Sequence, residues 1–161
     1  MSDTLIALTS QPTTQPQETC KAIVFAIANH LLALPVSAIF KVVQYSPALS
    51  HSIHTKELIL FYQQPLTLLD LHPVLTQPSD TPQERSPTEC LIIAQAQQGL
   101  YAIPVDQPPT LQELAFSSIH PLPTHYSKAI AHIASHFALL YQHDAAPKIL
   151  LLDLYQASHQ E

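Results

Sequence analysis

The segment 21–36 reads KAIVFAIANHLLALPV, and further along the chain the segment 89–105 reads ECLIIAQAQQGLYAIPV. In both copies two apolar runs surround a short polar connection and end at Pro-Val, which is the pattern of a β-hairpin. Each copy is followed downstream by an apolar run that ends in Asp-Leu, at Asp70 and at Asp153. The chain is therefore expected to contain two similar β units.

Short apolar runs and proline-rich turns fill the rest of the chain. Fifteen prolines against one glycine interrupt helices and leave the turns to other residues. Short strands at regular spacing, joined by hairpins and bends, are typical of all-β barrels. We therefore expect a flexible N-terminal tail at 1–19, a first unit at about 20–75, a Pro-rich linker at 76–88 and a second unit at about 89–157.

Two details stay open at the level of sequence. The connection in the first hairpin is interpreted as Asn29-His30, with no fixed turn type because histidine stands where glycine is usual. The stretch Ala129–Gln142 fits both a helical stripe and one face of a strand, so its period alone does not decide. The internal repeat favours the strand, because the first half carries a strand before its own Asp-Leu run.

Composition argues against several classes of function. The 161 residues carry a net charge of −6, and the six Lys and Arg residues are scattered. No basic stripe follows a phosphate backbone, so nucleic-acid binding is not expected. No apolar run approaches a membrane-spanning length, and Met1–Gln17 lacks the features of a signal peptide. Two cysteines do not make a disulfide framework, so a cytoplasmic protein without direct membrane insertion is the simplest interpretation.

Asp70 and Asp153 occupy matching places in the repeat. One interpretation is a pair of carboxylates in acid–base catalysis. The other is that each carboxylate accepts backbone N–H bonds where a buried strand ends. Repetition in both halves, without a partner base nearby in the sequence, favours the structural interpretation.

Ten histidines raise the hypothesis of a metal site. His132 and His136 are four residues apart, as in a helical zinc pair, but no His-Glu-x-x-His or Cys-x-x-Cys motif accompanies them. Cys20 and Cys90 lie at equivalent places in the repeat without a neighbouring histidine, so inert, partly buried thiols are expected. A single glycine excludes the P-loop and the dinucleotide fingerprint. We expect no metal, no cofactor and no enzymatic activity.

Five phrases of the chain stand in a characteristic order. They are Phe25-Ala26-Ile27, LALPVSAI at 32–39, Leu69-Asp70-Leu71, Ile103–Asp106 and LLDL at 151–154. In this order they resemble the CheW-like domains, the adaptor modules of bacterial chemosensory arrays. The resemblance covers roughly residues 20–157. It implies an all-β fold of two five-stranded SH3-like barrels packed side by side, with short helical turns.

The resemblance also implies a non-catalytic signalling adaptor. Such a scaffold couples the regulatory domain of a CheA-type histidine kinase to the cytoplasmic tip of a methyl-accepting chemoreceptor, in chemotaxis, phototaxis or pilus-driven motility. The kinase-facing segment corresponds to Ile39, Phe40 and Lys41. If this strand alternates, at least one of Ile39 and Phe40 points outward. Ile39→Asp is then expected to weaken kinase binding by at least about 2 kcal/mol, whereas a core position for Ile39 would make the variant unfold.

The chain departs from the family pattern in two places. Lys41 stands where the family usually has an acidic residue. The family typically reads Asn-Leu-Arg-Gly where this chain reads Leu60-Phe61-Tyr62-Gln63, so the receptor-binding Arg becomes Tyr62 and the turn Gly becomes Gln63. Phe61, Tyr62 and Gln63 are the expected receptor-side residues, with an aromatic surface in place of a cation. The alternative is a CheW-like regulator that has lost receptor coupling and acts as an array spacer or binds another signalling protein.

Overall fold

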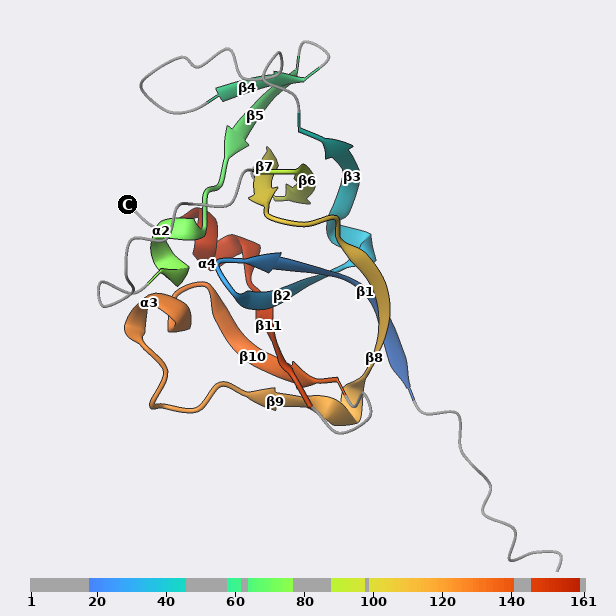
Figure 1. Cartoon of the computed structure of the whole chain (residues 1–161), viewed down its shortest axis with the longest axis vertical. Coiled ribbons are helices and arrows are strands. Elements are labelled where there is room, and N and C mark those ends of the chain that lie inside the picture. The colour runs from blue at the N-terminus through green and yellow to red at the C-terminus, as the bar shows by residue number, and fades with distance from the viewer. Residues whose placement is uncertain are drawn as a thin grey trace, which may run out of the picture.

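A computed structural model describes residues 18–45, 58–61, 64–76, 88–97, 99–140 and 146–159, with the backbone alone at 58–61 and 64. This part of the chain is all-β, as expected, with a few short helical turns (Figure 1). Most of the expected tail 1–19 and of the linker 76–88 lies outside the described residues, although Thr19 already begins a strand. No described helix is long and apolar enough to cross a membrane.

Two sheets make up the fold. The larger has the strand order β8-β1-β2-β11-β10-β9, and the smaller has the order β3-β6-β7-β5-β4. The strands of the larger sheet are β1 (Thr19–Ile27), β2 (His30–Pro35), β8 (Thr110–Ala115), β9 (Ile119–Pro121), β10 (Ala134–Leu139) and β11 (Lys148–Leu152). Those of the smaller sheet are β3 (Ile39–Gln44), β4 (Leu58–Phe61), β5 (Gln64–Leu68), β6 (Cys90–Ala96) and β7 (Gly99–Val105).

Short helical turns connect these strands. In the described residues they are η1 (Val36–Ala38), α2 (His72–Leu75), η3 (Phe116–Ser118), α3 (Lys128–Ala131) and α4 (Leu154–Ser158). The larger sheet has six strands where five were expected, because η3 bends the chain and leaves β9 as a separate strand after β8. Figure 1 shows this bend at the bottom of the molecule, where β8 runs into β9 and the larger sheet curls like a barrel.

The two halves of the sequence do not coincide with the two sheets. The hairpin β1–β2 pairs with β8 on one side and, in parallel, with β11 on the other, and both partners come from the second half. The hairpin β6–β7 likewise pairs with β3 and, in parallel, with β5 from the first half. The expected units at about 20–75 and 89–157 thus exchange their hairpins. Each hairpin satisfies the backbone groups of both its outer edges with strands of the other half.

The first hairpin turns one residue earlier than expected. Ile27 pairs with His30, so the two connecting residues are Ala28 and Asn29, and His30 already belongs to β2. Ala28 and Asn29 both have positive φ, at 49° and 65°. Positive φ at both central residues is the geometry of a type I′ turn, whose twist matches that of the flanking strands. Asparagine tolerates this conformation well, whereas alanine adopts it at some cost.

The ambiguous stretch 129–142 contains both kinds of structure. Ser127 caps the single-turn helix α3, since its Oγ accepts a hydrogen bond from the N–H of Ile130 at 3.3 Å. The chain then extends as β10 from Ala134 to Leu139, which is the strand that the repeat favoured. Residues 141 and 142 lie outside the described residues.

The largest hydrophobic cluster joins the two sheets. Phe25 and Ile27 of β1 contribute to it together with Ile92 of β6 and Ile103 of β7. Two smaller clusters each belong mainly to one sheet, around Val24 in the larger and around Ile93 in the smaller. The two faces of each hairpin therefore bury apolar side chains in different clusters. For this reason the strands of the hairpins carry apolar residues on both faces.

Candidate protein-docking surfaces

Phe40 is an exposed aromatic side chain of the predicted kinase-side segment. It lies in β3, which among the described strands pairs with β6 alone and is an edge strand of the smaller sheet. Ile39 pairs with Ala94 and Lys41 with Ile93, so Phe40 is the extra residue of a bulge. Bulges change the direction in which a side chain points. Here the Phe40 side chain is 58% exposed.

Ile39 differs from its neighbour. Its side chain is half-buried and packs against the largest hydrophobic cluster. A carboxylate at position 39 would therefore lie against this cluster, which favours a loss of stability in Ile39→Asp; the effect of this substitution on folding and on kinase binding stays a prediction. The expectation that at least one of the two residues points outward is met by Phe40.

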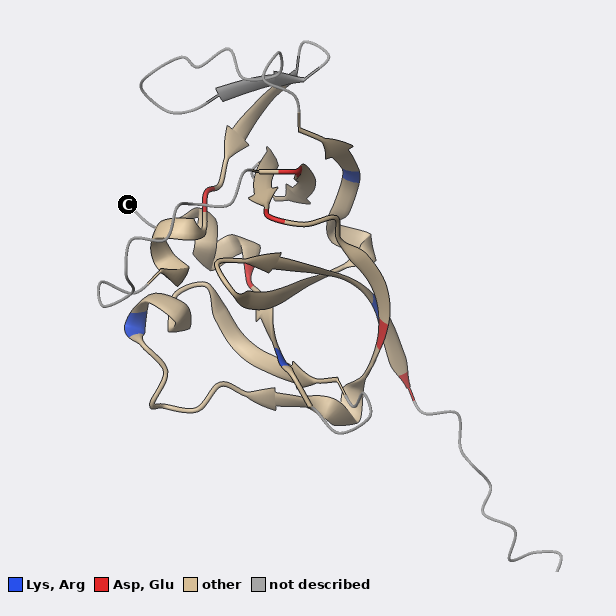
Figure 2. Cartoon of the chain, viewed as in Figure 1, with Lys and Arg blue, Asp and Glu red and all other residues tan. Residues whose placement is uncertain are grey.

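Three other residues near Phe40 in the sequence are exposed. Val36 in η1 and Val42 in β3 are both exposed hydrophobic residues, and Lys41 is exposed beside them. We call Val36, Phe40, Lys41 and Val42 the β3 surface. Lys41 is the charged residue of β3, and Figure 2 shows the basic positions of the described chain scattered over several elements. Apolar anchors around a single cation suit a protein partner rather than a phosphate backbone.

The predicted receptor-side segment is only partly described. Phe61 ends β4 and pairs with Gln64 of β5, whereas Tyr62 and Gln63 lie outside the described residues. Because β3 and β4 are the first and last strands of the smaller sheet, the two predicted docking segments belong to its two opposite edges.

Asp70 and Asp153 both act at the ends of strands, which supports the structural interpretation. Asp153 follows β11, and its Oδ1 accepts a hydrogen bond from the N–H of Gln156 at 3.2 Å, so it caps α4. Asp70 follows β5, and its Oδ1 accepts a hydrogen bond from the N–H of His72 at 3.1 Å. The repeat thus places a carboxylate where each half turns from its last strand into a helix.

Removal of the Asp153 cap gives a measurable loss of stability. We expect Asp153→Ala to lower the free energy of unfolding by about 1 kcal/mol, the usual effect of losing a helix N-cap. Chemical denaturation of the two proteins measures this difference. Asp153→Asn keeps a capping oxygen and serves as the control, with little expected change. Equal losses in both variants would contradict the capping role.

Sequence reasoning did not single out His72. This buried histidine lies between two carboxylates, with Nδ1 at 2.8 Å from Asp70 Oδ1 and Nε2 at 2.6 Å from Asp106 Oδ1. The other oxygen of Asp106 accepts a hydrogen bond from the N–H of Ala28 at 3.0 Å. The signal available in the sequence was that Asp70 and Asp106 both stand in phrases that resemble the family, but nothing in the sequence showed that they converge on one histidine.

The other candidate side chains of the sequence are dispersed. His132 and His136 are both exposed, and His136 Nδ1 lies 2.8 Å from the Oγ of its neighbour Ser135. In the described part of the chain no group of three His, Cys, Asp or Glu side chains is arranged to hold a metal ion. Burial, and then the neighbouring Glu89 carboxylate, raise the pKa of the Cys90 thiol, so that less of it is the reactive thiolate.

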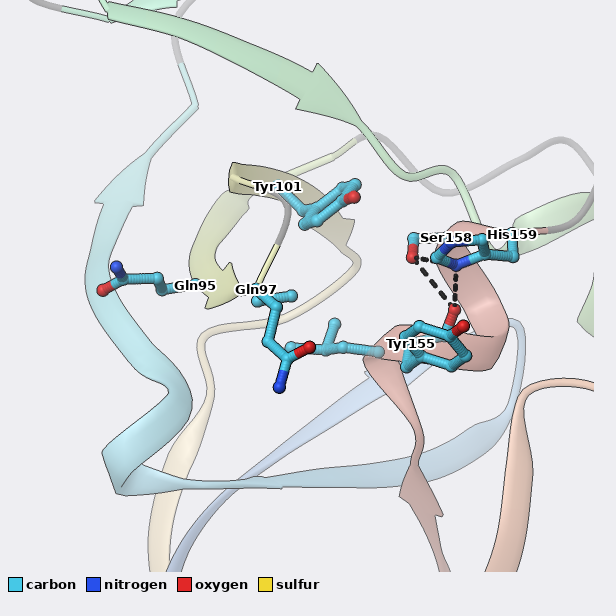
Figure 3. A pocket seen from close by; sticks show the side chains of 8 residues that line it. Gln95, Gln97, Tyr101, Tyr155, Ser158 and His159 are labelled. Carbon is cyan, nitrogen blue, oxygen red and sulfur yellow. Dashed lines mark hydrogen bonds between the residues drawn. The ribbon is translucent and has the colours of Figure 1, made fainter.

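A groove of about 300 Å³ lies between the β6–β7 hairpin and α4. Figure 3 shows Tyr155 and Ser158 of α4 and the following His159 on one side of it, and Gln97 and Tyr101 on the other. Tyr155 is 62% exposed, and its ring lies 4.3 Å from that of His159. The groove is therefore mainly aromatic and apolar in character.

The pair Ser158–His159 in this groove does not form a nucleophile and a base. Ser158 Oγ is 3.2 Å from His159 Nδ1, but the same Nδ1 lies 2.6 Å from the carbonyl oxygen of Tyr155. A carbonyl only accepts, so Nδ1 carries the proton and has no lone pair for the serine hydroxyl. Ser158 itself donates to the Tyr155 carbonyl at 3.0 Å. Both side chains close the C-terminal end of α4.

The chain was compared with known proteins. The family model described as CheW-like domain matches residues 21–156. Among solved structures, the chain is similar to the scaffolding protein TtCheW from Thermoanaerobacter tengcongensis, with a TM-score of 0.66 and 18% identity over 88% of each chain. At this identity the likeness shows the fold. No match was found among curated proteins.

Proposed function

Because the chain belongs to the CheW-like domain family, the adaptors of chemotaxis signalling, we propose that it couples a CheA-type histidine kinase to the cytoplasmic tip of methyl-accepting receptors. Members of this family are non-catalytic scaffolds, which agrees with the expectation from the sequence that the protein is not an enzyme. The pathway served is chemotaxis, phototaxis or pilus-driven motility. The adaptor works in the cytoplasm, where the kinase and the receptor tip meet.

One observation carries the kinase side of this proposal. An aromatic side chain, Phe40, is held out of the core by a bulge in an edge strand and is flanked by exposed Val36 and Val42. Binding hot spots are enriched in large side chains that become fully desolvated in the complex. The β3 surface therefore supports docking of the kinase regulatory domain through Phe40, as the anchor, and Lys41. Ile39, the third residue of the predicted segment, is half-buried against the hydrophobic cluster.

The receptor side of the proposal rests on the other edge of the same sheet. Phe61 ends β4 at that edge, and Tyr62 and Gln63 follow it in the sequence. Aromatic residues there replace the cation typical of the family, so the receptor tip that docks on it has an apolar or aromatic counterpart surface. An adaptor with its two docking segments on separate strands holds both partners at once.

The substitution Phe40→Asp tests the kinase side. We expect it to weaken binding of the kinase regulatory domain by at least about 2 kcal/mol, or about 30-fold, because an unpaired carboxylate would be desolvated in the complex. Isothermal titration measures the affinity, and the melting temperature of the free variant shows that the fold persists. Tyr155→Asp is the matched control, since Tyr155 is an equally exposed aromatic residue on α4. Unchanged affinity in Phe40→Asp would remove the β3 surface from the interface.

A second observation supports the alternative function, an array spacer without receptor coupling. Leu111 of β8 and Phe116 of η3 are 59% and 52% exposed, which gives the larger sheet an apolar surface of its own. β8 pairs with the first strand of the β1–β2 hairpin as β3 pairs with the first strand of the β6–β7 hairpin, so Leu111 lies on the strand equivalent to β3. A spacer would contact one neighbour through each surface. The test is whether the protein binds an isolated receptor tip. If it does, the spacer alternative is wrong.

A further inference from the structure

The larger sheet ends at β8, whose outer edge faces no other described strand. Among the described strands β8 pairs with β1 alone, and Figure 1 shows it along one side of the molecule. The register between the two strands runs without a shift from Thr110 to Ala115. The strand therefore presents a regular backbone edge over all six of its residues.

The pairing with β1 decides which backbone groups of β8 point outward. In an antiparallel pair, residues that exchange backbone hydrogen bonds with their partner alternate with residues that exchange none. Phe116, in register with Glu18, donates its N–H to the Glu18 carbonyl oxygen at 3.0 Å, so this position is a bonded one. By alternation the N–H and C=O groups of Leu111, Glu113 and Ala115 point away from β1. These groups have no hydrogen-bond partner among the described residues.

Two other edges of the sheets carry protection that β8 lacks. Natural sheets protect exposed edges with short strands, prolines, bulges or charged side chains. The strand β9 has three residues and ends in Pro121, and β3 is interrupted by the bulge at Phe40. The strand β8 has neither a proline nor a bulge, and its charged residue is Glu113. A regular edge of this kind is a template for a further strand.

The side chains of β8 specify the chemistry of such a strand. Leu111 is 59% exposed, and the exposed Glu113 lies on the same face, because residues two apart in a strand share a face. Leu114, on the other face, is buried in the cluster around Val24. Glu113 forms no ion pair with a described residue. An added strand with an apolar residue opposite Leu111 and a basic residue opposite Glu113 would cover the leucine and pair the carboxylate.

We propose that β8 is a strand-addition site for an extended segment of a partner protein, which carries a basic side chain opposite Glu113 and an apolar side chain opposite Leu111. Main-chain hydrogen bonds to the outward groups supply the affinity, and the alternate side chains supply the specificity. The site belongs to the larger sheet, so it does not depend on the docking segments proposed on the two edges of the smaller sheet.

A short peptide is the probe for this site. On its bonded side β8 already faces Lys21 opposite Glu113 and Ile23 opposite Leu111. The probe copies that pattern as the acetylated, amidated peptide Thr-Ser-Lys-Ala-Ile-Thr-Thr. In the ¹⁵N-labelled full chain we expect saturating peptide to slow hydrogen exchange of the three outward amides at least about tenfold. The amide of Leu114, which already points to β1, is the internal control and should not change.

Reversal of charge tests the specificity of the site. A peptide with glutamate in place of the lysine should bind the native protein about fivefold more weakly, because like charges opposite each other disfavour strand pairing. The variant Glu113→Lys should show the reverse preference, and its melting temperature shows whether the fold persists. Equal binding of both peptides to both proteins would overturn the assignment of a basic partner segment.

Proline at an outward position tests the hydrogen-bonding edge itself. Ala115 has a φ of −70° and points its N–H away from β1, so proline fits there without breaking the pairing with β1. We expect Ala115→Pro to keep the native melting temperature and to weaken peptide binding at least about fivefold. If this variant does not fold, the charge-reversed pair decides.

Three results would overturn the proposal. The first is unchanged peptide binding in a folded Ala115→Pro protein. The second is the absence of any response of the outward amides at millimolar peptide. The third is a dimer of the native protein, seen by sedimentation, that Ala115→Pro separates, since the occupant of β8 would then be a second copy of this chain and not a separate partner.

Discussion

Residues 1–79 and 80–161, produced as two separate chains, are each expected to remain unfolded and to form native β structure only after mixing. Neither sheet can be built from one half, since β1 and β2 find their outer partners in β8 and β11, and β6 and β7 find theirs in β3 and β5. An isolated hairpin is marginally stable in water at best. Separation therefore removes the whole folding free energy, on the order of 5–15 kcal/mol for such a domain.

Far-UV circular dichroism and sedimentation of each half, and of their equimolar mixture, measure this outcome. The intact chain at the same concentration is the control. Cooperative thermal unfolding of either half alone would contradict the structural role of the hairpin exchange. The mixture should instead recover the spectrum of the intact chain, with a stability that depends on concentration because two chains associate.

Ile39→Asp is expected to lower the free energy of unfolding by about 3 kcal/mol, whereas Phe40→Asp, one residue away, changes it by less than about 0.5 kcal/mol. Ile39 packs against the hydrophobic cluster that joins the two sheets, so its replacement brings an unpaired carboxylate to the edge of an apolar core. Phe40 is mainly in solvent, and a charge there stays hydrated.

Denaturant titration of both variants separates the two positions. Ile39→Val is the control for packing alone, with an expected loss of about 0.5–1.5 kcal/mol. A stable Ile39→Asp protein would mean that this side chain turns outward in solution. In that case Ile39 would be a second anchor residue beside Phe40 in the kinase-side segment.

The hairpins of this fold could be predicted from sequence because their signals are local. Alternation in segments such as Ile23–Ile27, a polar connection and a following apolar run are all read within about sixteen neighbouring residues. The choice of partner strands is not local. Nothing in the apolar run of β11 (Lys148–Leu152) distinguishes β2 from β7 as its parallel neighbour, because either would bury the same face.

The candidate docking surface shows the same limit at the scale of single residues. Alternation placed one of Ile39 and Phe40 outward, but only the bulge in the pairing of β3 with β6 decides which one. The cluster around His72 was missed for a similar reason. Asp70 and Asp106 both belong to sequence phrases that resemble the family. Their contacts with one imidazole, however, depend on how strands of the two halves pair, and a local sequence pattern does not predict that pairing.

The exchange of hairpins also bears on how the protein is made. Leu31 of the first hairpin pairs with Ile149, so this hairpin waits for its parallel partner until nearly the whole chain has been translated. Ribosomes add about 5–20 residues per second, which makes the wait on the order of ten seconds. During that interval the nascent chain presents an unpaired apolar edge to its neighbours on the polysome. This edge is therefore covered only when synthesis is nearly complete.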